Sequence, residues 1–218
     1  MTTAAGAASH AEGVQTGTVG IASHAEGVQS IAYGIGSHAE GTPIVLDEDG
    51  NETSIGPITF RLPDGTSLED ISVNIAYGDG SHAEGILTVA YGQGSHSEGL
   101  ANIASGIVSH VEGGENIASG MGSHAEGIIN TASGNASHVE GVGNTASNDS
   151  SHAEGQGTVA DGEGAHAEGS ETNANGSFSH AEGKLSIASG NNSHAEGLGS
   201  KAEGENSHTE GNTTTASG

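Results

Sequence analysis

A five-residue motif, Ser-His-Ala-Glu-Gly or a close variant, recurs every 14 residues along most of this chain. Every step between neighbouring histidines is 14 residues, except the step from His38 to His82, which is 44. A repeat this regular, held in one phase, is typical of a solenoid with one coil per repeat. The histidines are His10, His24, His38, His82, His96, His110, His124, His138, His152, His166, His180, His194 and His208.

Each repeat contains a second motif seven residues from the first, as in Ile103-Ala104-Ser105-Gly106. Side chains that alternate and then meet a glycine predict a short strand followed by a tight corner. Two such strands per repeat give an all-β parallel β-solenoid, a β-roll with 14-residue coils about 4.8 Å apart. Alternation places Ser and Ala in a narrow core and His and Glu on the outside.

The composition suits a narrow core, because 39 residues are glycine, none is tryptophan and two are phenylalanine. A core of alanine buries too little apolar surface to offset the ordering entropy of a single chain. We therefore expect self-association, with a homotrimer as the closed form. An apolar column is expected to face outward and take part in it: Ile31, Ile75, Val89, Ile103, Ile117, Val159 and Ile187.

The two motifs, with their 14-residue period, resemble the head repeats of trimeric autotransporter adhesins, the YadA-like β-roll. The Ser-His-Ala-Glu-Gly motif is also similar to repeats in phage and prophage fibre proteins. The resemblance covers residues 3–41 and 72–218. It implies a left-handed parallel β-roll and a homotrimer that serves as a rigid head or shaft. The sequence departs from the adhesins in showing no neck motif, coiled-coil stalk or membrane anchor.

A glutamate follows each histidine by two residues, so the coils are expected to stack a His–Glu ladder on their outer face. The favoured interpretation is structural, with each histidine donating to a glutamate carboxylate. Zinc binding is the weaker alternative, because the repeat offers no closed four-ligand set. A Ser-His-Glu triad is excluded, since strand neighbours such as Ser123 and His124 point to opposite faces. We thus expect no catalytic residue, cofactor or metal site. The glutamates are Glu12, Glu26, Glu40, Glu84, Glu98, Glu112, Glu126, Glu140, Glu154, Glu168, Glu182, Glu196 and Glu210.

Residues 42–71 interrupt the repeat and divide the chain into β-roll repeats 1–41, an inserted lobe 42–71 and continuing repeats 72–218. The insert holds all three prolines and two turn-like Asp-Gly pairs, which predicts a β-hairpin-like lobe. The lobe is either a recognition site for a receptor or glycan, or a clamp between subunits. A calcium site in the acidic run 47–52 is disfavoured, because the EF-hand ligand pattern is absent. The candidate recognition residues are Ile58, Phe60, Arg61 and Leu62.

Three tyrosines, Tyr33, Tyr77 and Tyr91, occupy the serine position of the second motif in the repeats near the insert. They either pack against its base or stack on carbohydrate, and packing is favoured.

The chain carries 28 acidic and 3 basic residues, a formal net charge of −25, and no cysteine. This charge disfavours nucleic acid and anionic membranes as partners, and no apolar run is long enough for membrane insertion. We expect a non-enzymatic structural protein: an adhesin-type fibre or extracellular filament used for surface attachment. The alternative is a phage or prophage tail-fibre segment that positions a host-recognition or hydrolase domain outside this chain. Either function implies an extracellular, cell-surface or virion location, with a host surface receptor or glycan as a partner.

Both ends of the sequence lie in copies of the second motif, at Ala4 and at Ala216. Solenoids need capped ends to avoid edge-to-edge pairing. The sequence therefore predicts either a slice of a longer fibre or end-to-end self-assembly.

Overall fold

The structure, a computed structural model, describes residues 2–42, 44–46, 52–54, 58–61, 67–71 and 74–218, and for the strands between 43 and 73 it describes the backbone alone. The chain forms two compact units, Met1–Glu115 and Asn116–Gly218. Every regular element in the described residues is a β-strand. Across these same residues no helix is present that could cross a membrane.

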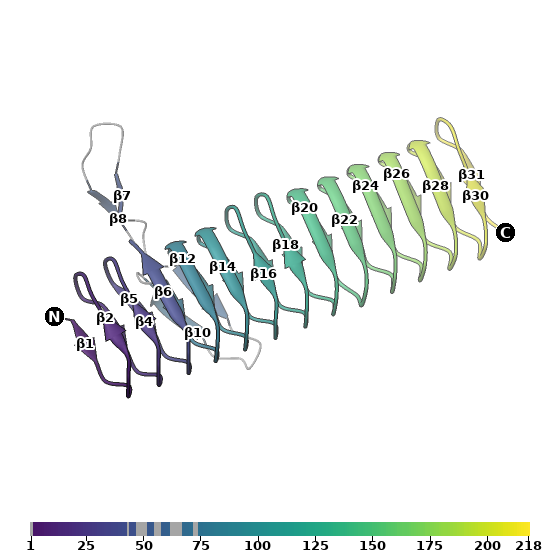
Figure 1. Cartoon of the computed structure of the whole chain (residues 1–218). Coiled ribbons are helices and arrows are strands. Elements are labelled where there is room, and N and C mark those ends of the chain that lie inside the picture. Colours follow the sequence, from purple (N-terminus) through teal and green to yellow (C-terminus); the bar gives the residue numbers. More distant parts are fainter. Residues whose placement is uncertain (1, 43, 47–51, 55–57, 62–66, 72–73) are drawn as a thin grey trace. The chain divides into compact units, whose positions relative to one another are not determined.

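In the first unit each 14-residue coil contributes one strand to each of two parallel sheets (Figure 1). We call the sheet whose strands begin on the repeated histidines the His sheet, and the other the second sheet. The His sheet contains β2 (His10–Ala11), β4 (His24–Ala25), β6 (His38–Gly41), β12 (His82–Ile86), β14 (His96–Leu100) and β16 (His110–Val111). The second sheet contains β1 (Thr3–Ala4), β3 (Gly17–Thr18), β5 (Ser30–Ala32), β11 (Asn74–Ala76), β13 (Val89–Ala90) and β15 (Ile103–Ala104).

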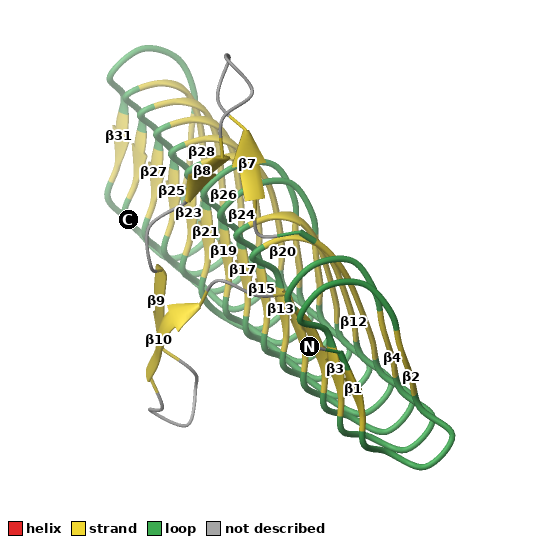
Figure 2. Ribbon diagram, turned by 90° about the vertical axis from the view of Figure 1, so that its left-hand side faces the viewer, coloured by secondary structure: helices red, strands yellow, loops and turns green. Residues whose placement is uncertain are grey.

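The second unit repeats this arrangement, and Figure 2 shows the two sheets of its coils joined by loops at both ends. Its His sheet contains β18 (His124–Ala125), β20 (His138–Val142), β22 (His152–Gln156), β24 (His166–Ser170), β26 (His180–Lys184), β28 (His194–Leu198) and β30 (His208–Thr209). Its second sheet contains β17 (Ile117–Ala118), β19 (Thr131–Ala132), β21 (Thr145–Ala146), β23 (Val159–Ala160), β25 (Asn173–Ala174), β27 (Ile187–Ala188), β29 (Lys201–Ala202) and β31 (Thr215–Ala216).

Neighbouring coils stack in register, so each residue lies beside its own repeat equivalent. His82 pairs with His96, and Glu84 pairs with Glu98. The register also passes across the insert, because His82 pairs with His38. The prediction of an all-β parallel solenoid with 14-residue coils is thereby confirmed.

The core of each coil is built from small side chains. Most histidines are followed by an alanine without exposed surface, such as Ala25 or Ala153, and the central alanine of the second motif is buried in the same way at Ala32 and Ala160. A serine precedes every histidine except His166, and it is buried in most coils, as at Ser123. Two strands separated by so narrow a core are filled mostly by small side chains, with an occasional valine such as Val111, and this explains the composition.

Two glycine columns allow the coils to approach one another. A Cβ atom at Gly92, in the second motif, would lie 1.9 Å from the carbonyl oxygen of Gly106 in the next coil. Gly99, after the repeated glutamate, has a φ of +102° and a Cβ there would lie 2.2 Å from the Gly113 oxygen. Glycine is thus required for stacking as well as for turning. Left-handed corners also occur at other residues, such as Val108 with a φ of 49°.

The expected outward apolar column is more covered than predicted. Ile117 is 37% exposed, but Val89 and Ile103 are buried. They pack together with Ile75 and Tyr91 on the outer side of the second sheet. Large side chains in register at the close spacing of stacked strands cover one another, so this column exposes less surface than a single strand would.

Within the insert, β7 (Ile44–Leu46) pairs antiparallel with β8 (Glu52–Ser54), and β9 (Ile58–Arg61) pairs antiparallel with β10 (Ser67–Ile71). Of the candidate recognition residues, Ile58, Phe60 and Arg61 lie in the backbone of β9. Their side chains, and Leu62 as a whole, fall outside the described residues, as do most of residues 47–52.

Candidate functional site: the His–Glu face

The repeated histidines and glutamates form two rows on the outer face of the His sheet. Each histidine is the first residue of its strand and the glutamate lies two residues later, so both side chains point away from the core. Between the ends of the chain their side chains are half-buried, as at His152 and Glu154 with 33% and 32% exposed. The first pair, His10 and Glu12, is exposed at 64% and 61%.

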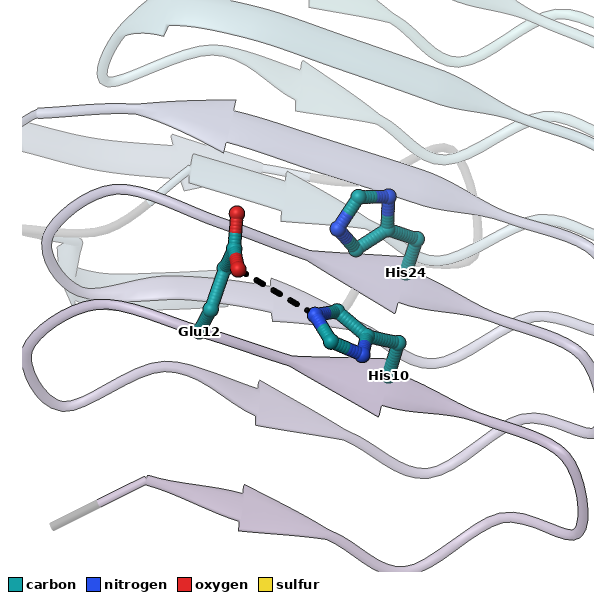
Figure 3. A group of neighbouring side chains, drawn as sticks. All are labelled: His10, Glu12 and His24. Atoms are coloured by element: carbon teal, nitrogen blue, oxygen red, sulfur yellow. Dashed lines mark hydrogen bonds and ion pairs between the residues drawn. The ribbon is translucent and has the colours of Figure 1, made fainter.

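The imidazole rings stack along each row. The ring centroids of His82 and His96 lie 4.9 Å apart with 3° between the ring planes, and those of His152 and His166 lie 4.7 Å apart with the same angle. The stack continues past the insert, since the rings of His38 and His82 are 4.7 Å apart. His10 and His24 differ, with an angle of 75° between their rings (Figure 3).

In most coils the histidine faces the glutamate of its own coil. In Figure 3, Nε2 of His10 lies 3.3 Å from Oε2 of Glu12, within hydrogen-bonding distance. Further along, the distances are longer: 3.7 Å between His82 and Glu84, and 3.8 Å between His152 and Glu154. At His180 the imidazole lies between two carboxylates, 3.9 Å from Glu168 and 3.8 Å from Glu182.

The imidazole nitrogens that face the glutamates are shielded from water. Within the described part of the chain, several Nε2 atoms are buried and have no hydrogen-bond partner: those of His38, His82, His96, His152, His166, His180 and His194. Burial, helped by repulsion from neighbouring imidazoles, lowers the pKa of His82, His152 and His166 below the ordinary value of 6.5. These rings are therefore neutral at pH 7, with a lone pair free on one nitrogen.

The glutamate row shares protons between coils. Hydrogen bonds with Glu182 and Glu154 raise the pKa of Glu168 to about 7. The same contacts lower the pKa of Glu154 and Glu182, because their carboxylates accept the shared proton. Stacked carboxylates repel when all are ionised, and a proton held between neighbours relieves that repulsion.

Two coils together bring three metal-binding atoms close to one another. In groups such as His38–Glu40–His82 and His180–Glu182–His194, two imidazole nitrogens and one carboxylate oxygen all lie within 4.8 Å of one another. The first group, His10–Glu12–His24, is drawn in Figure 3. A single repeat holds only two of the three ligands, so the convergence of neighbouring coils was not predicted from the sequence.

The serine before each histidine does not meet the imidazole. Ser123 is buried in the core, and its Oγ donates to the carbonyl oxygen of Gly120 at 2.7 Å. Ser23 and Ser37 bond in the same way to Gly20 and Gly34. This serine closes the corner of the coil.

A buried asparagine column, not anticipated from the sequence, supports the far corner. Asn130 has no exposed surface; its Nδ2 donates to the carbonyl oxygens of Glu126 and Gly141, and its Oδ1 accepts from the backbone of Asn144. Asn144 repeats these contacts one coil later. The 14-residue spacing of Asn102, Asn116, Asn130 and Asn144 was the available signal.

The tyrosines stack on one another. The rings of Tyr77 and Tyr91 lie 4.8 Å apart, and those of Tyr33 and Tyr77 lie 5.6 Å apart. Tyr91 packs against the Val89–Ile103 cluster, whereas Tyr33 and Tyr77 keep 41% and 50% of their surface exposed. Packing thus accounts for Tyr91, and an exposed aromatic surface remains at the other two.

The comparison with models of protein families gives no match, and the comparison with curated proteins gives none either. Function is therefore inferred from the geometry of the coils.

Proposed function

We propose that this chain is a structural segment of an extracellular fibre, a left-handed β-roll that associates as a homotrimer into a rigid rod or filament used for surface attachment. The observation that carries the proposal is the in-register stacking of equivalent residues, histidine on histidine and glutamate on glutamate. Such a ladder extends by adding identical coils, and it gives each coil the same outer surface.

The thin core supports association. The core side chains are chiefly alanine, serine, threonine and asparagine, so one chain buries little apolar surface on folding. A partner surface would add the burial that the coil lacks.

Exposed apolar side chains flank the His–Glu face and offer such a surface. One set lies three residues before the histidine, and the other lies two residues after the glutamate. We call them together the apolar rim; exposed examples are Ile21, Ile35, Ile107 and Met121 on one side and Val14, Leu100, Ile128, Val142 and Leu198 on the other. Half-buried polar rows between apolar edges suit an interface with copies of the same chain.

The test is the mass in solution, measured by light scattering coupled to size-exclusion chromatography over a hundredfold range of concentration. A constant mass of three chains supports a trimeric fibre segment. A mass that grows with concentration supports end-to-end filament assembly of the same fibre. A single-chain mass throughout would refute the proposal.

A substitution in the apolar rim locates the interface. The double variant Ile128→Glu and Val142→Glu places charges at two side chains that are 51% and 46% exposed, so the folded monomer tolerates them. We expect this variant to raise the dissociation constant of the trimer at least tenfold. The control Asn175→Glu adds a charge at an exposed polar residue of the second unit, outside the apolar rim, and should leave the mass unchanged.

A further inference from the structure

We propose that neighbouring coils of the His sheet bind divalent transition-metal ions such as Zn²⁺, each through two imidazoles and one glutamate. Two nitrogens and one carboxylate oxygen form a known zinc donor set, with the fourth position left to water. The ligands of each site come from one chain, and they lie on the same His–Glu face that the association proposed above would cover.

In several groups, the distance between the histidine nitrogen and the glutamate oxygen fits coordination of a shared ion better than a direct hydrogen bond. The Nε2–Oε2 distances of His82–Glu84, His152–Glu154 and His194–Glu196 are 3.7–3.8 Å, too long for a hydrogen bond. Two ligand atoms on a tetrahedral zinc ion with bonds of about 2.0 Å lie about 3.3 Å apart. The pair therefore needs to close by only about half an ångström to hold an ion.

The orphaned nitrogens give an independent reason. In the part of the chain that the structure describes, Nε2 of His82, His152 and His194 is buried and has no hydrogen-bond partner. A buried polar atom without a partner is costly, and coordination of an ion would satisfy it.

The second imidazole comes from the next coil. All three ligand atoms of the group His152–Glu154–His166 lie within 4.8 Å of one another. The two rings are stacked nearly parallel, so they must turn about χ2 to share one ion, and this torsion is soft in histidine. An ion would also offset the repulsion within the glutamate row.

The choice of ion follows from the donor atoms. Imidazole nitrogen suits zinc, nickel and copper, whereas magnesium and calcium prefer all-oxygen sites. Groups that share a histidine, such as those on either side of His82, compete for that imidazole. Thirteen histidines taken two at a time therefore allow at most six ions per chain.

The test compares two variants that each lose six histidines to glutamine and keep seven. The alternating variant leaves no two neighbouring coils with histidine; it changes His24, His82, His110, His138, His166 and His194. The block variant removes every histidine of the first unit and leaves seven neighbouring coils intact in the second; it changes His10, His24, His38, His82, His96 and His110.

Metal-free protein is titrated with Zn²⁺ against a chromophoric chelator at pH 7.5 and physiological salt. We expect up to six ions on the unchanged chain, about three on the block variant and none on the alternating variant. Mg²⁺ should not compete. Equal stoichiometry in the two variants would show that the acidic surface, and not paired imidazoles, takes up the metal, and would overturn the proposal.

If the alternating variant fails to fold by circular dichroism, Co²⁺ on the unchanged chain decides the matter. Coordination by two imidazoles and a carboxylate gives the intense visible bands of four-coordinate Co²⁺. The weak bands of six-coordinate, mostly water-bound Co²⁺ would refute the site.

Discussion

Single buried polar residues connect neighbouring coils, and Asn130 shows how. It makes one contact within its own coil, at Glu126, and others to the backbone of the next coil, at Gly141 and Asn144. Threonine occupies the same column at Thr88 and Thr158, where its hydroxyl also finds a partner in the preceding asparagine. The column thus requires a short hydrogen-bonding side chain, which alanine cannot supply.

We expect Asn130→Ala to lower the free energy of unfolding by about 2–3 kcal/mol, because it leaves buried backbone groups without partners. Asn130→Thr introduces a residue that the column already accepts at other coils, and it should lose less than half as much. Chemical denaturation of both variants measures the difference. Equal losses would mean that the side-chain volume, and not its hydrogen bonds, stabilises this corner.

A single glutamate should make stability depend on pH in an unusual direction. The folded-state pKa of Glu168 is raised to about 7 from an ordinary value of 4.5, so the folded chain holds this proton more tightly than the unfolded chain. Its contribution is fully present below pH 4.5 and is lost as the pH rises through 7. The side chain is 33% exposed, so solvent screening limits the effect to about 1 kcal/mol.

The variant Glu168→Gln keeps an amide donor between Glu154 and Glu182 at every pH. We expect it to be more stable than the unchanged chain by about 1 kcal/mol at pH 8, and equal to it near pH 4.5. Melting curves at the two pH values test this. Glu163→Gln, an exposed position outside the glutamate row, serves as the control and should show no such dependence. A benefit of Glu168→Gln that is the same at both pH values would contradict the shared proton.

At the scale of the coil, the stacking distance depends on residues that have no side chain. Gly92 and Gly114 belong to the same unit but differ in their surroundings: a Cβ at Gly92 would meet the backbone of Gly106 at 1.9 Å, whereas a Cβ at Gly114 would meet nothing within 4 Å. Backbone atoms of the next coil cannot move aside as a flexible side chain would. Gly92→Ala must therefore separate two coils locally.

We expect Gly92→Ala to reduce stability by about 3 kcal/mol, and Gly114→Ala to change it by less than about 1 kcal/mol. Hydrogen exchange of backbone amides should show faster exchange in the coils on either side of Gly92 only. Similar losses in the two variants would contradict the role of close approach at Gly92, because neither glycine has a positive φ.

The coil could be predicted from the sequence because its determinants are local and repeated. The 14-residue period gives the length of the coil, and the alternation around His124 places Ala125 inside. The burial of Val89 and Ile103 could not be foreseen, because it depends on packing with Ile75 and Tyr91. The ladder of His and Glu was likewise predictable, but its three-atom groups depend on side-chain orientations in two coils.

At the scale of the whole molecule, repetition multiplies a weak effect of each coil. Burial is the largest cause that lowers the pKa of five histidines: His38, His82, His152, His166 and His180. Each is less readily protonated in the folded chain than in the unfolded chain, whose histidines titrate near 6.5. Their neutral state therefore favours folding above pH 6.5, and this contribution is lost as the pH falls below it.

Because the raised pKa of Glu168 acts in the opposite direction, the histidine effect is best measured as a difference. A triple variant with His152, His166 and His180 changed to glutamine, which does not titrate, keeps the whole glutamate row. Between pH 7.5 and pH 5.5 we expect the unchanged chain to lose stability relative to this variant, on the order of 1 kcal/mol after allowance for solvent screening. Melting of both proteins without metal, across this range of pH, measures the difference. A difference that stays constant would mean that folding does not shift the pKa of these imidazoles, and it would contradict the prediction. A difference that shifts toward the unchanged chain as the pH falls would mean that the glutamates hold the imidazoles protonated and that the stacked rings are cationic in the folded protein.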